Sequence, residues 1–355
     1  MKNATLKLLF LFLLLTSTNN FAQCGNGLVT LSTQLEVNNF MSTIPLCTQF
    51  NGSLDISGAD ISDLSALSTL TGISGNFRIW NSPLLTNLQG LHNLTTIGGT
   101  LDLSGFNFPL VNLNGLSGLQ TVGGMVLIVN FQNLESVQGI SNLQSVEGNF
   151  LIQNNNNVAF TSILLPNLEF VGNFNIRNNN NLTTISCANL ESTGSRFQLV
   201  ANANLLSANF PALVIVGENL STSAQIDTGY FEINQCLNLL NTDFSSLTTI
   251  KGAVDIIQNS NLQSLGFQNL TSVLRSIRIN ANPLLATLEG LELTGNVTSF
   301  SLIGSNVSNL NTLSEVTSIG SGTIGDLMIS DNPLLSDILG LSAITSINRN
   351  LEITN

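Results

Sequence analysis

The sequence predicts a mainly β protein, a single-chain β-solenoid of about thirteen coils of 23–25 residues. Three observations support this fold class: a short strand pattern that repeats, Asn residues at fixed positions in the repeat, and a low charge. Only 8% of the 355 residues are charged, against roughly 25% in ordinary soluble proteins. A solenoid explains all three, because stacked coils commit most positions to buried apolar side chains, corner glycines and Asn.

Residues 1–23 predict a secretory signal peptide. Lys2 and Lys7 precede an apolar run of eight residues, and Phe-Ala-Gln then offers a cleavage site before Cys24. The run is too short for a membrane-spanning helix, which needs about 20 residues, and no later segment is long and apolar enough. We therefore expect an exported protein without a membrane-spanning segment. A lipoprotein modified at Cys24 is the alternative.

Residues 24–50 are predicted to form an N-terminal cap. Cys24 and Cys47 both lie in this cap, and export permits a disulfide between them. Cys187 and Cys236 fall on different sides of the repeat, two coils apart. We expect these two side chains to be buried and unpaired.

Residues 51–355 carry the repeat, an apolar-x-apolar strand pattern. The strands begin at Leu54, Phe77, Leu101, Val126, Phe150, Phe174, Phe197, Phe231, Val254, Ile277, Phe300, Leu327 and Leu351. Such a regular spacing predicts that each coil adds one strand to a continuous parallel sheet. The coil that begins at Phe197 is longer by about 11 residues, near 218–230, and this segment is a candidate contact loop.

Two further columns appear when the first strand residue is counted as offset zero. Offset eight is apolar in most coils, Val158 and Leu182 among them, and is predicted to point inward. Offset five holds Asn155, Asn179, Asn202, Asn259, Asn282 and Asn332. Stacked Asn side chains can bond the backbone and each other where the chain leaves the strand, so we interpret this column as structural.

The coil itself resembles known repeats. The segment from Val171 to Leu182 reads V-x-x-F-x-I-x-x-N-x-N-L, which is similar to the leucine-rich-repeat core. Three longer stretches, 81–91, 282–291 and 332–341, resemble the receptor L-domain family. The resemblance covers roughly residues 50–355 and implies a right-handed, leucine-rich-repeat-like β-helix, as one or two L-domain units. It also implies a place in extracellular binding regions of receptors or in secreted and surface proteins.

The leader and the Asn-rich, charge-poor coils also resemble secreted proteins of Bacteroidetes, which often add a C-terminal sorting domain. We therefore expect the mature protein to be secreted or held at the cell surface. A sorting or anchoring domain beyond Asn355 and the oligomeric state are left open by the sequence.

The outward strand positions, offsets one and three, form the variable face on which a solenoid normally binds. The candidate ligand-face residues are Arg78, Trp80, Leu127, Val129, Leu151, Arg177, Glu232 and Arg278. Three of them form an apolar patch and Trp80 stands beside Arg78; exposed apolar groups of this kind mark interaction surfaces. We predict an extracellular protein or a glycan as the ligand.

Composition excludes several other functions. Nine Lys and Arg spread along a chain of net charge −12 cannot form the cationic surface that nucleic acid requires. The only histidine is His92, and no catalytic triad, Cys/His metal spacing or phosphate loop is present. We therefore predict no catalytic, metal-ligating or cofactor-binding residues, and no cofactor.

One pair of carboxylates keeps an enzyme hypothesis open. Glu232 and Asp255 lie on adjacent coils, at a spacing that suits a retaining glycosidase. No aromatic platform or basic residue accompanies them, so chance placement is the preferred interpretation. The primary hypothesis is an exported, non-enzymatic binding or adhesion protein. The alternatives are a structural cell-surface stalk element and, behind it, a polysaccharide-active β-helix enzyme.

Overall fold

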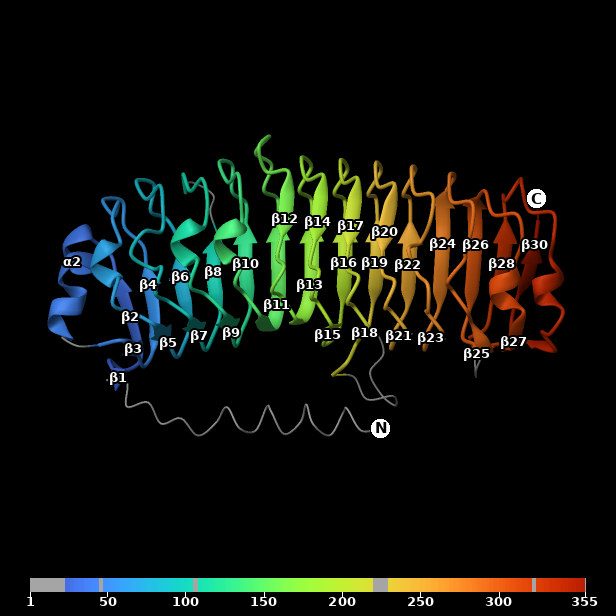
Figure 1. Ribbon diagram of the computed structural model, residues 1–355, viewed down its shortest axis with the longest axis horizontal. Coiled ribbons are helices and arrows are strands. Elements are labelled where there is room, and N and C mark those ends of the chain that lie inside the picture. The colour runs from blue at the N-terminus through green and yellow to red at the C-terminus, as the bar shows by residue number, and fades with distance from the viewer. Residues whose placement is uncertain (1–22, 45–46, 105–107, 220–228, 321–323, 355) are drawn as a thin grey trace.

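Parallel strands lie side by side along the long axis of a rod, and a helix covers its N-terminal end (Figure 1). The computed structural model describes residues 23–44, 47–104, 108–219, 229–320 and 324–354. The predicted signal peptide lies outside the described residues except for Gln23, and most of the extra segment near 218–230 lies outside them as well.

The main sheet contains one strand from each coil, paired in parallel with the strand of the next coil. Its strands are β2 (Leu28–Leu31), β4 (Ser53–Ile56), β6 (Phe77–Ile79), β8 (Leu101–Ser104), β10 (Val126–Val129), β11 (Ser145–Gln153), β13 (Phe170–Arg177), β16 (Phe197–Val200), β19 (Phe231–Asn234), β22 (Val254–Ile257), β24 (Ile277–Asn282), β26 (Phe300–Ser305), β28 (Leu327–Ser330) and β30 (Leu351–Ile353). The register pairs equivalent offsets, for example Phe174 with Phe197. The predicted β-solenoid of about thirteen coils is confirmed.

A second column of short strands forms the corner that precedes the main strands. These are β1 (Gln23–Cys24), β3 (Gln49–Phe50), β5 (Gly72–Ile73), β7 (Thr96–Ile97), β9 (Thr121–Val122), β15 (Ser192–Thr193), β18 (Ile215–Val216), β21 (Thr249–Ile250), β23 (Ser272–Val273), β25 (Thr294–Val297), β27 (Glu315–Ile319) and β29 (Ser346–Ile347). In the middle of the rod, β11 and β13 run through this corner without a break and pair in both columns.

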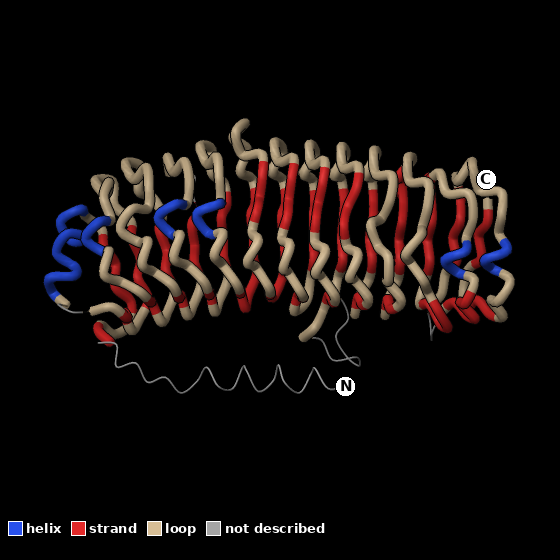
Figure 2. The backbone as a smooth tube through the Cα atoms, viewed as in Figure 1, coloured by secondary structure: helices blue, strands red, loops and turns tan. Residues whose placement is uncertain are grey.

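The side of each coil opposite the main sheet changes character along the rod (Figure 2). It is formed by short 3₁₀ helices near the two ends, η1 (Ser65–Leu67), η2 (Asn114–Leu116), η3 (Gln138–Ile140), η4 (Asn311–Leu313) and η5 (Leu339–Leu341). The central coils instead have a third strand column, β12 (Ser162–Leu164), β14 (Thr184–Ser186), β17 (Ser207–Asn209) and β20 (Asn241–Asp243). The outer coils are therefore leucine-rich-repeat-like, and the central coils form a true β-helix.

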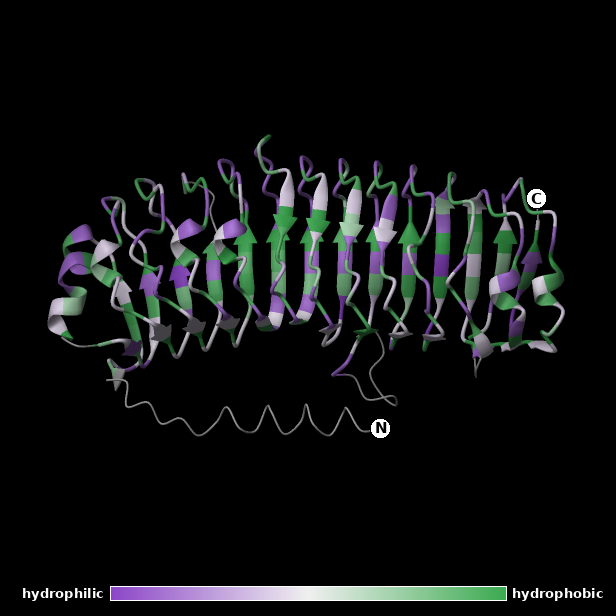
Figure 3. Ribbon diagram, viewed as in Figure 1, coloured by the Kyte–Doolittle hydropathy of each residue, from purple (hydrophilic) through white to green (hydrophobic). Residues whose placement is uncertain are grey.

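The core is a continuous stack of apolar side chains between these layers. Successive strand residues point to opposite faces, so polar and apolar bands alternate along strands such as β24 (Figure 3). Phenylalanines at offset zero stack from coil to coil, with ring centroids 5.1 Å apart for Phe174 and Phe197 and 5.2 Å apart for Phe197 and Phe231. Cys187 and Cys236 are buried and unpaired, as predicted.

The predicted Asn column is a buried ladder. In Asn179, Oδ1 accepts a hydrogen bond from the backbone N–H of Asn155 at 3.0 Å, and Nδ2 donates to the carbonyl of Ile152 at 3.0 Å. Asn202 in turn accepts from the backbone N–H of Asn179 at 3.1 Å. Each Asn therefore satisfies backbone groups of the preceding coil that would otherwise be buried without a partner.

Val158 corrects the prediction that offset eight points inward, since its side chain is 83% exposed. Phe160 takes the buried place in that coil. In the next coil, the turn is closed by a hydrogen bond from the N–H of Leu182 to the carbonyl of Asn179. In this coil, the equivalent bond runs from the N–H of Phe160 to the carbonyl of Asn157, at 3.0 Å. Two additional residues at the turn thus move the inward position from offset eight to offset ten.

The N-terminal end of the core is covered by α2 (Gln34–Thr43). Thr33 and Glu36 form a capping box that fixes the start of this helix. Phe40 packs edge-on against Phe50, with ring centroids 5.6 Å apart. A disulfide joins Cys24 to Cys47, with the two Cα atoms 5.6 Å apart. It closes the segment that contains β2 and α2.

Candidate ligand-binding face

The outward side chains at offsets one and three of the main strands lie in two rows across the sheet, because neighbouring strands pair at equal offsets. These two rows are called the sheet face below. All eight candidate residues belong to it, on β6, β10, β11, β13, β19 and β24. Seven of them form three groups along the rod, of which the second and the third meet at the paired strands β11 and β13. The eighth, Arg278, forms an ion pair with Asp255.

The first group is an aromatic and cationic pair at the end of β6, with Arg78 in the strand and Trp80 directly after it. The guanidinium of Arg78 lies 4.7 Å from the ring centroid of Trp80, a cation–π contact. Arg78 also faces Asp102 on β8, with Nε and Oδ2 3.2 Å apart, although its N–H is not directed at the oxygen. Trp80 remains 38% exposed. It is the only Trp of the chain.

The second group is the apolar patch, Leu127 and Val129 on β10 and Leu151 on β11. Leu127 pairs with Leu151, and Val129 pairs with Gln153, in the parallel register. All three apolar side chains are half-buried. They form a small hydrocarbon surface, flanked by polar side chains on β8 and β13. Such a surface is suited to contact with a partner that can remove it from water.

The third group is a polar network on the central strands, and it begins at Arg177 on β13. Its Nε donates to Oδ1 of Asn175 at 2.8 Å, and a terminal nitrogen lies 3.4 Å from Oε1 of Gln198. Gln198 donates to Glu232 at 2.7 Å, and Asn234 donates to the same carboxylate at 3.0 Å. Side chains on β13, β16 and β19 are thus linked across three strands.

Not every offset-one position is open to solvent. The exposed fraction is 9% for Asn175, 8% for Gln198 and 1% for Asp255. Sequence reasoning took the whole row as outward and accessible. The structure corrects this, because long side chains on adjacent strands fold over their neighbours and hydrogen-bond to them.

Asp255 lies at the centre of a closed cluster. Arg278 donates to both of its oxygens, with Nε 2.7 Å from Oδ1, and the hydroxyl of Tyr230 donates to Oδ2. Burial, followed by the bond to the Asp255 carboxylate, raises the pKa of Tyr230 above its usual value. The same carboxylate raises the pKa of Arg278. Asp255 and Arg278 therefore form a neutralised ion pair that is fixed in place.

Glu232 and Asp255 pair in register on β19 and β22, as the repeat predicted. Each carboxylate is nevertheless occupied by its own neighbours: Gln198 and Asn234 for Glu232, and Arg278 and Tyr230 for Asp255. An acid and base for glycoside hydrolysis must face a sugar between them. These two are turned toward other side chains of the sheet face.

Tyr230 gives a direct test of the closed cluster, because it is the only Tyr of the chain. Its raised pKa favours the neutral phenol in the folded state. The resulting contribution to stability is present below the unfolded pKa of about 10 and is lost as pH rises through the higher folded pKa. In a 295 nm absorbance titration, we expect the native protein to form tyrosinate at a higher pH than the urea-unfolded chain.

The matched variant for this titration is Asp255→Asn, which removes the carboxylate and keeps the shape. It should move the native titration of Tyr230 down toward the ordinary value, while the unfolded chain titrates as before. Circular dichroism at each pH confirms that the native curve reports folded protein. A native Tyr230 that ionises near pH 10, as in the unfolded chain, would contradict the cluster.

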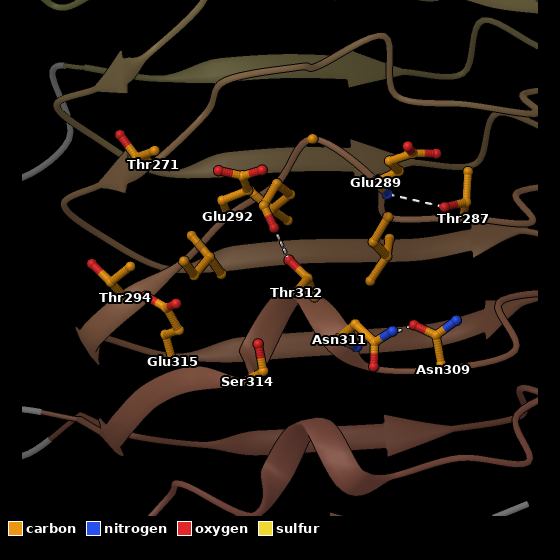
Figure 4. Close-up of a pocket in the computed structure, with 14 residues that line it drawn as sticks. Thr271, Thr287, Glu289, Glu292, Thr294, Asn309, Asn311, Thr312, Ser314 and Glu315 are labelled. Atoms are coloured by element: carbon orange, nitrogen blue, oxygen red, sulfur yellow. Dashed lines mark hydrogen bonds between the residues drawn. The ribbon is translucent and has the colours of Figure 1, made fainter.

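A groove on the opposite side of the rod was not predicted. It has a volume of about 600 Å³ and is lined by Glu289, Glu292, Glu315 and several hydroxyl side chains (Figure 4). Thr312 donates to the carbonyl of Leu291 at its floor, and Thr287 accepts from the N–H of Glu289 at 3.0 Å. A second recess, toward Asp243, shares part of this lining. No group of three His, Cys, Asp or Glu among the described residues could hold a metal ion.

Charge separates the two sides of the rod. Seven of the nine basic residues are described, and all seven lie in a main strand or in the corner directly before one. Within the described ranges, the turns and 3₁₀ helices on the groove side contain no Lys or Arg. Within the described ranges, contacts from Lys and Arg are therefore available only from the sheet side.

Comparison with known proteins adds one finding. Residues 46–121 match the family model of the receptor L domain. The matched receptor L-domain segment spans β3 to β8 and includes Arg78 and Trp80, whereas Arg177, Glu232 and Arg278 lie outside it. Neither the comparison with curated proteins nor the comparison with solved structures found a match. Within the described part of the chain, no helix is both long enough and apolar enough to cross a membrane.

Proposed function

We propose that this protein is an exported, non-enzymatic binding or adhesion protein that presents its sheet face to an extracellular protein or glycan. The observation that carries the proposal is the sheet face itself. An exposed Trp80 stacked on Arg78, an apolar patch and charged side chains stand at the variable positions of a rigid, regular scaffold. The match of residues 46–121 to the receptor L domain supports a ligand-binding extracellular role.

Two features support export and a secreted or cell-surface location. Residues 1–23 have the composition of a secretory signal peptide. The disulfide between Cys24 and Cys47 suits an oxidising compartment.

Trp80 provides the test, because its fluorescence reports on this part of the face alone. Purified protein is screened on a glycan array and against extracellular and envelope proteins, and the affinity of each hit for the wild type and the variants is measured by isothermal titration calorimetry. For ligands that contain no Trp, the emission of Trp80 in the wild type is followed as well. We expect at least one ligand to change the emission, and Trp80→Ala to weaken its binding by about thirtyfold, as for a central aromatic contact. Val158→Ala, on the exposed turn away from the sheet face, should bind like the wild type.

Two outcomes would favour the other hypotheses. A stable protein that binds nothing in either screen would point to a structural stalk element. Release of reducing sugar from a polysaccharide panel, lost in Glu232→Gln, would establish the enzyme in spite of the occupied carboxylates.

A further inference from the structure

We infer that Arg177 anchors a carboxylate of a protein partner, whose neighbouring apolar side chain covers the patch formed by Leu127, Val129 and Leu151. This inference rests on the proposed function and names the partner chemistry for one part of the sheet face. It commits to a protein segment in which a single Asp or Glu stands beside an aliphatic or aromatic residue.

The charge of Arg177 is the first argument. Arg278 is neutralised by Asp255, and Arg78 faces Asp102 at 3.2 Å. No carboxylate of the described residues lies within ion-pair distance of Arg177, whose partners are the amide oxygens of Asn175 and Gln198. Among the described arginines of the main strands, Arg177 is thus the one whose charge is not neutralised by a carboxylate.

The geometry of Arg177 is the second argument. A guanidinium has five N–H groups in a fixed plane, and the two amides engage Nε and one terminal nitrogen. These amides are themselves buried, with Asn175 at 9% and Gln198 at 8% exposure. The guanidinium is therefore held in place before a ligand arrives. Its remaining donors suit the two oxygens of a carboxylate, and the entropy lost on binding is small.

The apolar patch favours a protein partner over a glycan. Leu151 pairs with Asn175, and Gln153 pairs with Arg177, so Arg177 lies on the strand next to the patch and diagonally from Leu151. Aliphatic side chains offer no partner to sugar hydroxyls, which would lose their hydrogen bonds to water there. An aliphatic or aromatic residue of a protein gains from the same burial.

The net charge narrows the partner further. The chain carries −12, so a strongly acidic segment would be repelled at long range. A single carboxylate on an otherwise neutral or basic segment avoids this repulsion and still pairs with Arg177 at short range. Arg177 is the only cation in this part of the described sheet face, and it therefore matches a partner segment that carries a single carboxylate.

A phage-displayed library of short random linear peptides, selected on the immobilised full chain, tests this directly. We expect the enriched peptides to share an Asp or Glu next to an aliphatic or aromatic residue. Arg177→Gln should weaken their binding by about tenfold or more. Leu151→Gln should weaken it as well. Arg349→Gln makes the same change in charge on the last described coils and should have no effect.

The peptide carries its own control. Exchange of the peptide's Asp or Glu for Asn or Gln should weaken its binding to the wild type. The same exchange should not weaken binding to Arg177→Gln any further, because in a double-mutant cycle the pair has already been broken. Thermal unfolding of each variant shows that it is folded. Peptides that bind equally well to Arg177→Gln would overturn the inference and leave the proposed function standing.

A glycan arm separates the two sources of carboxylate. Binding of an oligogalacturonate through Arg177, without an effect of Leu151→Gln, would replace the protein partner by an acidic glycan. If the wild type retains neither peptides nor glycans, the inference fails, and the proposed function is then decided by the screen of extracellular and envelope proteins.

Discussion

Replacement of Asn179 by alanine is expected to lower the free energy of unfolding by about 3 kcal/mol. The change removes an acceptor for the backbone N–H of Asn155 and a donor to the carbonyl of Ile152, both inside the rod. Each buried polar group left without a partner costs about 1–3 kcal/mol. Urea unfolding followed by circular dichroism measures the loss.

Two companion variants separate hydrogen bonding from packing. Asn179→Leu keeps most of the volume without any donor or acceptor, and it should be at least as unstable as Asn179→Ala. Asn180 is also an Asn, directly follows Asn179 in the chain and is exposed. The free energy of unfolding of Asn180→Ala should therefore stay within about 0.5 kcal/mol of the wild type. If Asn179→Leu is as stable as the wild type, the Asn ladder stabilises the fold by filling space and not by hydrogen bonding.

Loss of the disulfide is the second large effect. Its partners are 23 residues apart, and a closed loop of that length stabilises by about 3 kcal/mol in the chain-entropy account. We expect the double variant Cys24→Ala, Cys47→Ala to open the segment from β1 to α2 before the rest of the rod. Hydrogen exchange resolved by peptide should show faster exchange in residues 24–50, with the central coils almost unchanged.

Reduction of the wild type provides the control for this variant. Dithiothreitol should reproduce the faster exchange of the cap in the wild type and have no effect on the double variant. Cys187 and Cys236 are free, buried thiols in both proteins, so dithiothreitol has no disulfide to reduce there. Equal loss of protection in all coils would show that the cap and the rod unfold as one unit.

Much of the fold could be predicted because the repeat imposes one residue type on each structural position. The strand pattern predicted the register, and the Asn column predicted the ladder. The strand that begins the sheet was missed, because residues 24–50 were assigned to the cap. The pattern does mark it, since Val29-Thr-Leu31 stands 25 residues before Leu54 and β2 pairs with β4. Val158 was mispredicted, because an addition of two residues within a turn leaves the strand spacing almost unchanged.

The candidate face could be predicted only as rows of positions. Equal offsets place Asp255 next to Arg278 and Gln198 next to Glu232 in the register. Which of these side chains fold over their neighbours depends on rotamers and on competition for partners, which no spacing encodes. The groove near Glu289 was missed for a related reason, since it depends on how consecutive turns are spaced on the side where the repeat is least regular.

The ladder also governs how such a protein can change in size. Each Asn of the ladder bonds the backbone of the coil before it in the same way, as Asn179, Asn202 and Asn282 do. In two coils Cys236 and Ser305 take the place of the Asn. Duplication or deletion of one whole coil therefore leaves every remaining rung complete, whereas a partial insertion in the strand would break two. The rod can lengthen or shorten during evolution in increments of about 4.8 Å, the spacing of parallel strands, without new core packing. The span of the face can thus be adjusted to a partner separately from the residues that contact it.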